Sequence, residues 1–206
     1  ELPEVIPAKP QNLTTQEKQQ ILALFEDRIV KGEIEVSMLP TEEELDTMSD
    51  AEFFGIEQLL MEMSKKDPDV VMKEVMPINT DNNDFPVQLE AYPKELSKGS
   101  FKGVDSFHKG EGIATILDLD GTNRVLRLEN FSVTNGPDLR VYLSSHPNPS
   151  KSSEVTGGAS IELAKLKGNK GNQNYEVPDN VNIDDFSSVV IYCKPFRVIF
   201  ATAALN

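Results

Sequence analysis

Cys193 has the most distinctive chemistry in this sequence, because it is the only cysteine among 206 residues. Its thiol can cycle through a sulfenic acid or a mixed disulfide, or it can ligate a metal or haem as the thiolate. Each role needs a stabilised thiolate, and Lys194, Arg197 or a protonated His108 would lower the thiol pKa from its free value of about 8.5. The alternative is packing, since unpaired cysteine is among the most buried residue types. Both roles stay open from the residues alone.

Two histidines, His108 and His146, would complete the ligand inventory of a copper site with Cys193. A blue-copper site needs two imidazoles, a thiolate and a weak axial ligand, usually gathered close to the cysteine. Here K-P-F-R follows Cys193, without histidine or methionine. We therefore predict no metal site. The identity of any cofactor is left open, and copper and haem remain as alternatives. His146, in S-S-H-P-N-P-S, is interpreted as a solvated loop residue.

Asp138 ends the segment N-G-P-D at residues 135–138, whose glycine and proline are typical of a tight turn between strands. Its carboxylate could instead bind a cation or hold a histidine. Residues 167–174 are rich in glycine and amides but lack the lysine-serine pair of a phosphate loop, so nucleotide binding is not predicted. No Ser-His-Asp triad or catalytic carboxylate pair can be defended, and we do not expect an independent enzyme.

The chain is acidic, with a net charge of -14 and a pI near 4.6. Nucleic acid is not an expected partner, because phosphate binding needs clustered basic residues. No run of about 18 apolar residues exists, so we expect membrane contact only through a segment absent from this chain. Residues 1–11 contain three prolines and resemble a stiff linker. We expect an extracellular or cell-surface protein, anchored by a segment upstream of Glu1.

An acidic helical domain is predicted at residues 12–77. Capping boxes begin three helices, at Thr14 with Glu17, Thr41 with Glu44, and Ser49 with Glu52. In the third helix, apolar residues from Phe53 to Met63 step by three and four, which places Glu57 outward. A further helical turn is expected after Pro68, bearing Val71 and Val75. The six methionines lie in this part of the chain and are predicted to fill its core.

The apolar period changes to two after a predicted interdomain linker at residues 78–99. Residues 113–119 and 125–128 read as a hairpin around a turn at 120–123, and only residues 160–166 suggest a helical pattern. The last strand pair spans residues 187–201, with Val189, Ile191 and Cys193 on one face and a corner at Pro195. The predicted fold class is mainly β, an antiparallel sandwich or barrel at residues 100–206 preceded by a small α-helical segment.

Five segments between residues 99 and 205 form a recognisable series: G-S-F-K-G, F-H-K-G-E-G, R-L-E-N-F-S-V-T-N-G-P-D-L-R-V-Y-L, L-K-G-N-K-G-N-Q-N-Y-E-V-P and V-V-I-Y-C-K-P-F-R-V-I-F. In these segments and their order, residues 99 to 205 resemble the DM-thirteen domain family. Further matching positions are His108, Gly112, Phe131, Gly136, Pro137, Asp138, Gly168, Gly171, Tyr175, Pro178 and Phe196. Two departures are Tyr192, where the family often has tryptophan, and Ala201, where it often has glycine. The helical part has no counterpart in the family.

The resemblance implies a β-rich extracellular module with an electron-transfer role centred on its cysteine, which is Cys193 here. His108, Asp138 and Tyr192 are the candidate cofactor- or cation-binding residues, with a redox or surface protein as the expected partner. The alternative is a non-enzymatic β-sandwich that recognises a glycan or a protein, in which the cysteine is only structural.

Overall fold

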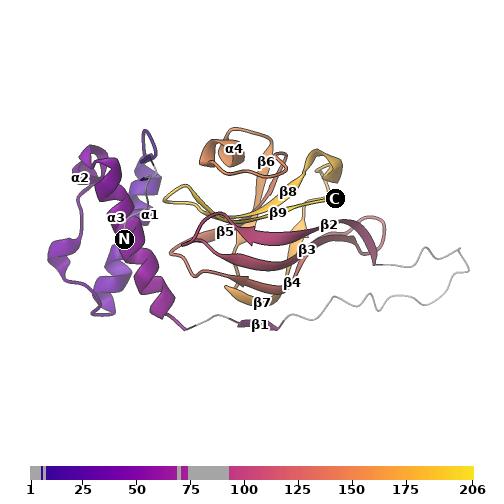
Figure 1. Ribbon diagram of the computed structural model, residues 1–206, viewed down its shortest axis with the longest axis horizontal. Helices are drawn as coiled ribbons and strands as arrows, with labels where there is room; N and C mark the ends of the chain where they lie inside the picture. Colours follow the sequence, from indigo (N-terminus) through magenta and orange to yellow (C-terminus); the bar gives the residue numbers. More distant parts are fainter. Residues whose placement is uncertain (1–5, 7, 69–70, 74–92) are drawn as a thin grey trace, which may run out of the picture. The chain divides into compact units, whose positions relative to one another are not determined.

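The computed structural model describes residue 6 and residues 8–68, 71–73 and 93–206. The chain divides into two compact units. The first contains helices α1 (Thr15–Val30), α2 (Glu42–Thr47) and α3 (Asp50–Lys66) and a short 3-10 helix at Val36–Met38, together with the loops Asn135–Asp138 and Cys193–Arg197. The second contains the strands (Figure 1).

All three predicted capping boxes are present. Thr14 accepts a hydrogen bond from the Glu17 backbone, while the Glu17 carboxylate accepts one from the Thr14 backbone N–H at 2.8 Å. The same reciprocal bonds begin α2 and α3. Each box satisfies amide donors that the first helical turn would otherwise leave unpaired. Gly32, with φ of 72°, follows the end of α1, where a left-handed residue is common and glycine adopts it without strain.

The core of the helical unit is contributed by Ile21 and Phe25 of α1, Leu45 of α2, and Phe53, Phe54, Leu60, Met61 and Met63 of α3. The prediction that methionines fill this core is therefore confirmed at Met61 and Met63, whereas Met38 is exposed. Glu57 was predicted to point outward, and this is wrong, because its side chain is only 3% exposed. Helix α3 buries residues around more of its circumference than a single apolar stripe would.

Where the structure describes it, the β unit is one nine-stranded sheet in the order β1-β7-β4-β3-β2-β9-β8-β5-β6. Its strands are β1 (Val71–Lys73), β2 (Lys94–Gly103), β3 (Gly110–Asp118), β4 (Arg124–Val133), β5 (Leu139–Ser144), β6 (Ser160–Lys165), β7 (Lys170–Val177), β8 (Ser188–Cys193) and β9 (Val198–Ala204). A short helix α4 (Ser152–Thr156) and a 3-10 turn (Ile183–Asp185) lie between strands.

The pairings β2–β3, β3–β4, β4–β7, β2–β9 and β5–β6 are antiparallel. Strands β6 and β7 contact each other although they lie far apart in the strand order, so the sheet curls into a nearly closed barrel or sandwich. This confirms the mainly β fold class with a small helical segment before it. The hairpin predicted at residues 113–128 is β3 and β4, joined by the turn at 120–123.

Two local predictions are wrong. Residues 71–73 form β1, which pairs in parallel with β7, where the sequence suggested a helical turn. Val75 lies outside the described residues. Residues 160–165 form β6, paired with β5, where a helical pattern was considered. In both places pairing with a strand distant in sequence decides the conformation, as is general for short segments with ambiguous propensity.

Candidate functional site

Cys193 is the last residue of β8, a strand in which all six residues are buried. The thiol itself is fully buried, with 0% of the residue exposed. Residues 194–197 then form a turn, and β9 resumes at Val198, so the predicted corner at Pro195 is confirmed. Period-two alternation turns the neighbouring Tyr192 to the opposite face of the strand.

Two backbone amides point at the sulfur. The N–H groups of Asp138 and Phe196 both donate hydrogen bonds to the Cys193 thiol. The Lys194 N–H in turn donates to the carbonyl oxygen of Asp138 at 3.2 Å. The loops Asn135–Asp138 and Cys193–Arg197, far apart in sequence, are therefore joined around one sulfur atom.

The Cys193 thiol is held in its neutral form. Burial raises its pKa far above the ordinary value, and the charge of Glu57 raises it further, while the two amide hydrogen bonds oppose the rise. Burial dominates because the thiolate loses its hydration. Lys194 and Arg197 were expected to stabilise a thiolate, yet neither is a cause of the shift. In this conformation the sulfur is protected and unreactive.

Helix α3 contributes two further residues to the surroundings of Cys193. The ring of Phe53 lies against that of Phe196, with centroids 5.6 Å apart. Glu57 is buried one helical turn further along and is close enough to act on the sulfur electrostatically. The sequence pattern missed Glu57, because a glutamate between apolar positions usually marks the solvated face of a helix.

Arg197 makes the most specific ionic contact of this unit. Its Nε and Nη2 atoms donate to the two carboxylate oxygens of Glu17, each at 2.8 Å, and its Nη1 donates to the Gln11 carbonyl oxygen at 3.3 Å. The Arg197 backbone is left-handed, with φ of 55°. Burial alone would raise the pKa of Glu17, but the bonds from Thr14 and Arg197 outweigh it and lower that pKa.

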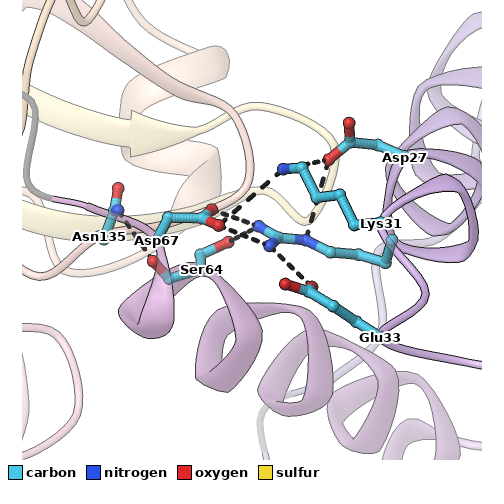
Figure 2. A network of polar contacts seen from close by, with 7 residues as sticks. Asp27, Lys31, Glu33, Ser64, Asp67 and Asn135 are labelled. Carbon is cyan, nitrogen blue, oxygen red and sulfur yellow. Dashed lines mark hydrogen bonds and ion pairs between the residues drawn. The ribbon is translucent and has the colours of Figure 1, made fainter.

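A second ionic cluster ties α1 to the end of α3 and is seen from close by in Figure 2. Arg28 donates to both carboxylate oxygens of Asp67, at 2.8 and 2.6 Å, to Glu33 at 3.0 Å and to the Ser64 hydroxyl at 3.1 Å. The Ser64 carbonyl oxygen accepts a bond of 2.9 Å from the Asn135 side chain. The cluster therefore reaches the same loop that supplies the Asp138 amide to the sulfur.

Tyr192 is held inside the β unit. Its hydroxyl lies 2.5 Å from that of Ser152, and its ring meets Tyr142 edge to face at 5.5 Å. It packs with Val155 and Ile199 in a buried apolar cluster. Tyr192 therefore contributes to the aromatic and apolar packing of the β unit.

His108 has a separate set of partners in the β unit. Its Nδ1 lies 2.7 Å from a carboxylate oxygen of Asp105, and its ring meets Phe200 at 4.4 Å. The other oxygen of Asp105 accepts the backbone N–H groups of Phe107 and His108. Burial alone would raise the pKa of Asp105, but the hydrogen bonds from His108 prevail and lower it.

The structure thus brings Asp138 to Cys193 and gives His108 and Tyr192 other neighbours. Within the described residues, no group of three or more His, Cys, Asp or Glu side chains could hold a metal ion. His146 has a side chain 42% exposed, with Nε2 lying 4.0 Å from Glu154. Among the helices that the structure describes, none is both long and apolar enough to cross a membrane.

One comparison with known proteins gives a match. The family model described as Electron transfer DM13 matches residues 100–205, which includes every strand from β3 to β9 and the end of β2 from Ser100. Neither the curated proteins nor the solved structures include a match to the chain.

Proposed function

Because the chain belongs to the Electron transfer DM13 family, with residues 100–205 forming its domain, we propose that this protein is an extracellular electron-transfer module whose redox group is Cys193. The observation that supports this choice is the pair of backbone amides, from Asp138 and Phe196, aimed at the sulfur. Sulfur is a weak acceptor, and a cysteine that only fills space needs no donors. Amide donors favour the thiolate, which is the nucleophilic form of the sulfur.

The proposed step is a two-electron oxidation of the thiol by a hydroperoxide. The sulfur attacks the outer peroxide oxygen, an S–O bond forms, and the O–O bond breaks. The thiol proton passes to the departing oxygen, so the products are a sulfenic acid and an alcohol or water. A thiol on a redox partner then condenses with the sulfenic acid, which forms a mixed disulfide and releases water. A second thiol of the partner attacks that mixed disulfide, so Cys193 returns to its thiol and the partner leaves as a disulfide. One cysteine per chain suffices when the partner supplies both of these thiols.

A trapping experiment tests this role. The native protein is treated with hydrogen peroxide in the presence of dimedone, and its intact mass is measured. We expect one adduct in the wild type and none in the matched variant Cys193→Ser. The proposal fails if the wild type gains an adduct only after it has been unfolded in denaturant.

A second candidate is a non-enzymatic recognition module in which Cys193 is structural. The observation that favours it is the complete burial of the thiol, with its raised pKa. Under this alternative, Cys193→Ala would leave binding of a surface glycan or protein unchanged. The trapping experiment separates the two candidates, since a structural thiol reacts only in the unfolded chain.

We further propose an extracellular or cell-surface location, an anchoring segment upstream of Glu1, and a redox or surface protein partner. The net charge of -14 supports a partner with a basic contact surface. Fractionation of cells that express the full-length protein tests the location, and recovery from the cytosolic fraction would contradict it.

A further inference from the structure

The two loops that enclose Cys193 are both held by the helices of the same compact unit. Arg197, in the loop Cys193–Arg197, pairs with Glu17 at the start of α1 through two bonds of 2.8 Å. In the other loop, Asn135 donates to the Ser64 carbonyl oxygen near the end of α3 at 2.9 Å. Phe196 lies against Phe53 of α3. The sulfur is therefore enclosed by contacts made at three places along the helices.

We propose that α1 and α3 form a gate over Cys193, closed by the Glu17–Arg197 ion pair, and that opening the gate admits the oxidant to the sulfur. This inference rests on the proposed function, because the gate would regulate the oxidation of Cys193. It explains how a fully buried thiol can be reached without unfolding the sheet that carries it.

The Glu17–Arg197 pair has the properties of a reversible closure. The side chains of Arg197 and Glu17 are 26% and 17% exposed, so water can replace each partner when the pair separates. An apolar core cannot exchange its contacts for water in this way without a large cost. The pair is geometrically specific, since a guanidinium fork meets a carboxylate in a two-bond arrangement.

Backbone strain also favours opening of the turn. Among the residues that the structure describes, Arg197 is one of three non-glycine residues with positive φ, at 55°. A left-handed arginine persists where surrounding contacts hold it, since the conformation is disfavoured for a residue with a Cβ. Loss of the Glu17 contact removes one of those constraints from the turn that begins at Cys193. Separation of the Glu17–Arg197 ion pair and release of the turn after Cys193 are therefore coupled.

Glu17 has a matched control elsewhere in the same unit. Its carboxylate also accepts the Thr14 backbone N–H that begins α1. Glu44 makes the same reciprocal bonds with Thr41 at the start of α2, where its carboxylate accepts from the Thr41 backbone N–H and hydroxyl. Glu17→Gln and Glu44→Gln thus remove the same charge from the same kind of capping box. Only the first weakens the contact with Arg197.

The test measures the rate at which native protein reacts with the aromatic disulfide reagent DTNB. When closing is fast, this rate is proportional to the equilibrium constant for opening. Loss of a two-bond, charge-assisted ion pair that is partly exposed to water should raise the equilibrium constant for opening by about tenfold. We expect Glu17→Gln and Arg197→Gln to react about tenfold faster than the wild type, with Glu44→Gln within about twofold of it. Raising NaCl to about 1 M, where the Debye length falls to about 3 Å, should accelerate the wild type and Glu44→Gln, which keep the pair, and should leave Glu17→Gln and Arg197→Gln unchanged.

Equal labelling rates in the wild type and all three variants would overturn the gate. So would a labelling rate that rises with urea as steeply as global unfolding does, because the thiol would then be reached only through the unfolded chain. The redox proposal fails separately. If Glu17→Gln labels faster but peroxide gives no dimedone adduct in it, the gate stands and the redox role of Cys193 falls.

Discussion

Removing the charge of Asp67 is expected to destabilise the helical unit through Arg28. Arg28 has a side chain only 7% exposed and donates two bonds to Asp67, the shorter at 2.6 Å. Asp67→Asn keeps the size and one acceptor oxygen but loses the negative charge. Figure 2 shows why the effect should spread, because Ser64 and Glu33 are arranged around the same guanidinium.

The magnitude follows from the exposure of each partner. Hydrogen bonds to a charged group contribute roughly 1.5–3 kcal/mol, and stripping the partner from a fully buried ion costs about 3–5 kcal/mol. Asp67 and Glu33 have side chains 30% and 32% exposed, so water screens part of the interaction. We therefore expect Asp67→Asn to cost about 2 kcal/mol of unfolding free energy. The remaining charge of Glu33 keeps Arg28 from being left without an anion.

The pH dependence has a definite direction. Hydrogen bonding from Arg28 lowers the pKa of Asp67. The stabilisation is therefore complete above the ordinary aspartate pKa of about 3.9 and is lost as the pH falls through the lower value of the folded state. The difference between the wild type and Asp67→Asn should shrink over that acidic window.

Urea unfolding followed by helical circular dichroism measures this difference, because the helical signal comes mainly from the unit that contains α1 and α3. Asp27→Asn is the control, since Asp27 lies 4.0 Å from the Arg28 Nε and its side chain is 55% exposed. A loss for Asp67→Asn within about 0.5 kcal/mol, the range of ordinary surface substitutions, would refute the reasoning. So would a difference that grows as the pH falls.

Two further predictions concern the β unit. Gly171→Ala should destabilise the protein by about 1–3 kcal/mol and speed hydrogen exchange in β1. The reason is that Gly171 has φ of 92° and an added Cβ would lie 2.1 Å from the Met72 carbonyl oxygen. The control Gly55→Ala, in an open part of α3, should instead be stabilising, and equal shifts in melting temperature for the two variants would contradict the prediction. Asp105→Asn should lower the unfolding free energy by about 1 kcal/mol at neutral pH, because the Asp105 carboxylate contacts His108 at 2.7 Å. This difference from the wild type should disappear as the pH falls through the lowered pKa of Asp105. A difference in melting temperature that does not depend on pH would count against the prediction.

The features that sequence predicted correctly are those determined by neighbours along the chain. A capping box needs a threonine or serine and a glutamate three residues later, so Thr14 and Glu17 identify the start of α1 without knowledge of the fold. The buried strand β8 and the turn after Cys193 follow from period-two alternation interrupted by a proline. In each case the relevant interactions are made within a few residues.

The contacts around the sulfur could not be predicted in this way. Arg197 and Glu17 are 180 positions apart, and Arg28 and Asp67 are 39 apart. No periodicity in the sequence pairs one charged residue with another at such separations. One indication was available, because Arg28 continues the apolar spacing of Ile21 and Phe25 on α1. An arginine on an apolar stripe predicts a buried cation that needs an anionic partner.

Part of the protection of Cys193 comes from residues that lie outside the segment that matches the family. The matched residues begin at 100, whereas Phe53 and Glu57, which contribute to the protection, lie on α3. The two amide donors to the sulfur, from Asp138 and Phe196, both lie inside the matched residues and oppose the rise in its pKa. The domain therefore supplies two amides that favour a thiolate, whereas the charges of Asp138 in the domain and Glu57 on the helical segment both disfavour it. Electron transfer at Cys193, as proposed, thus requires that the helices control when the sulfur is reached.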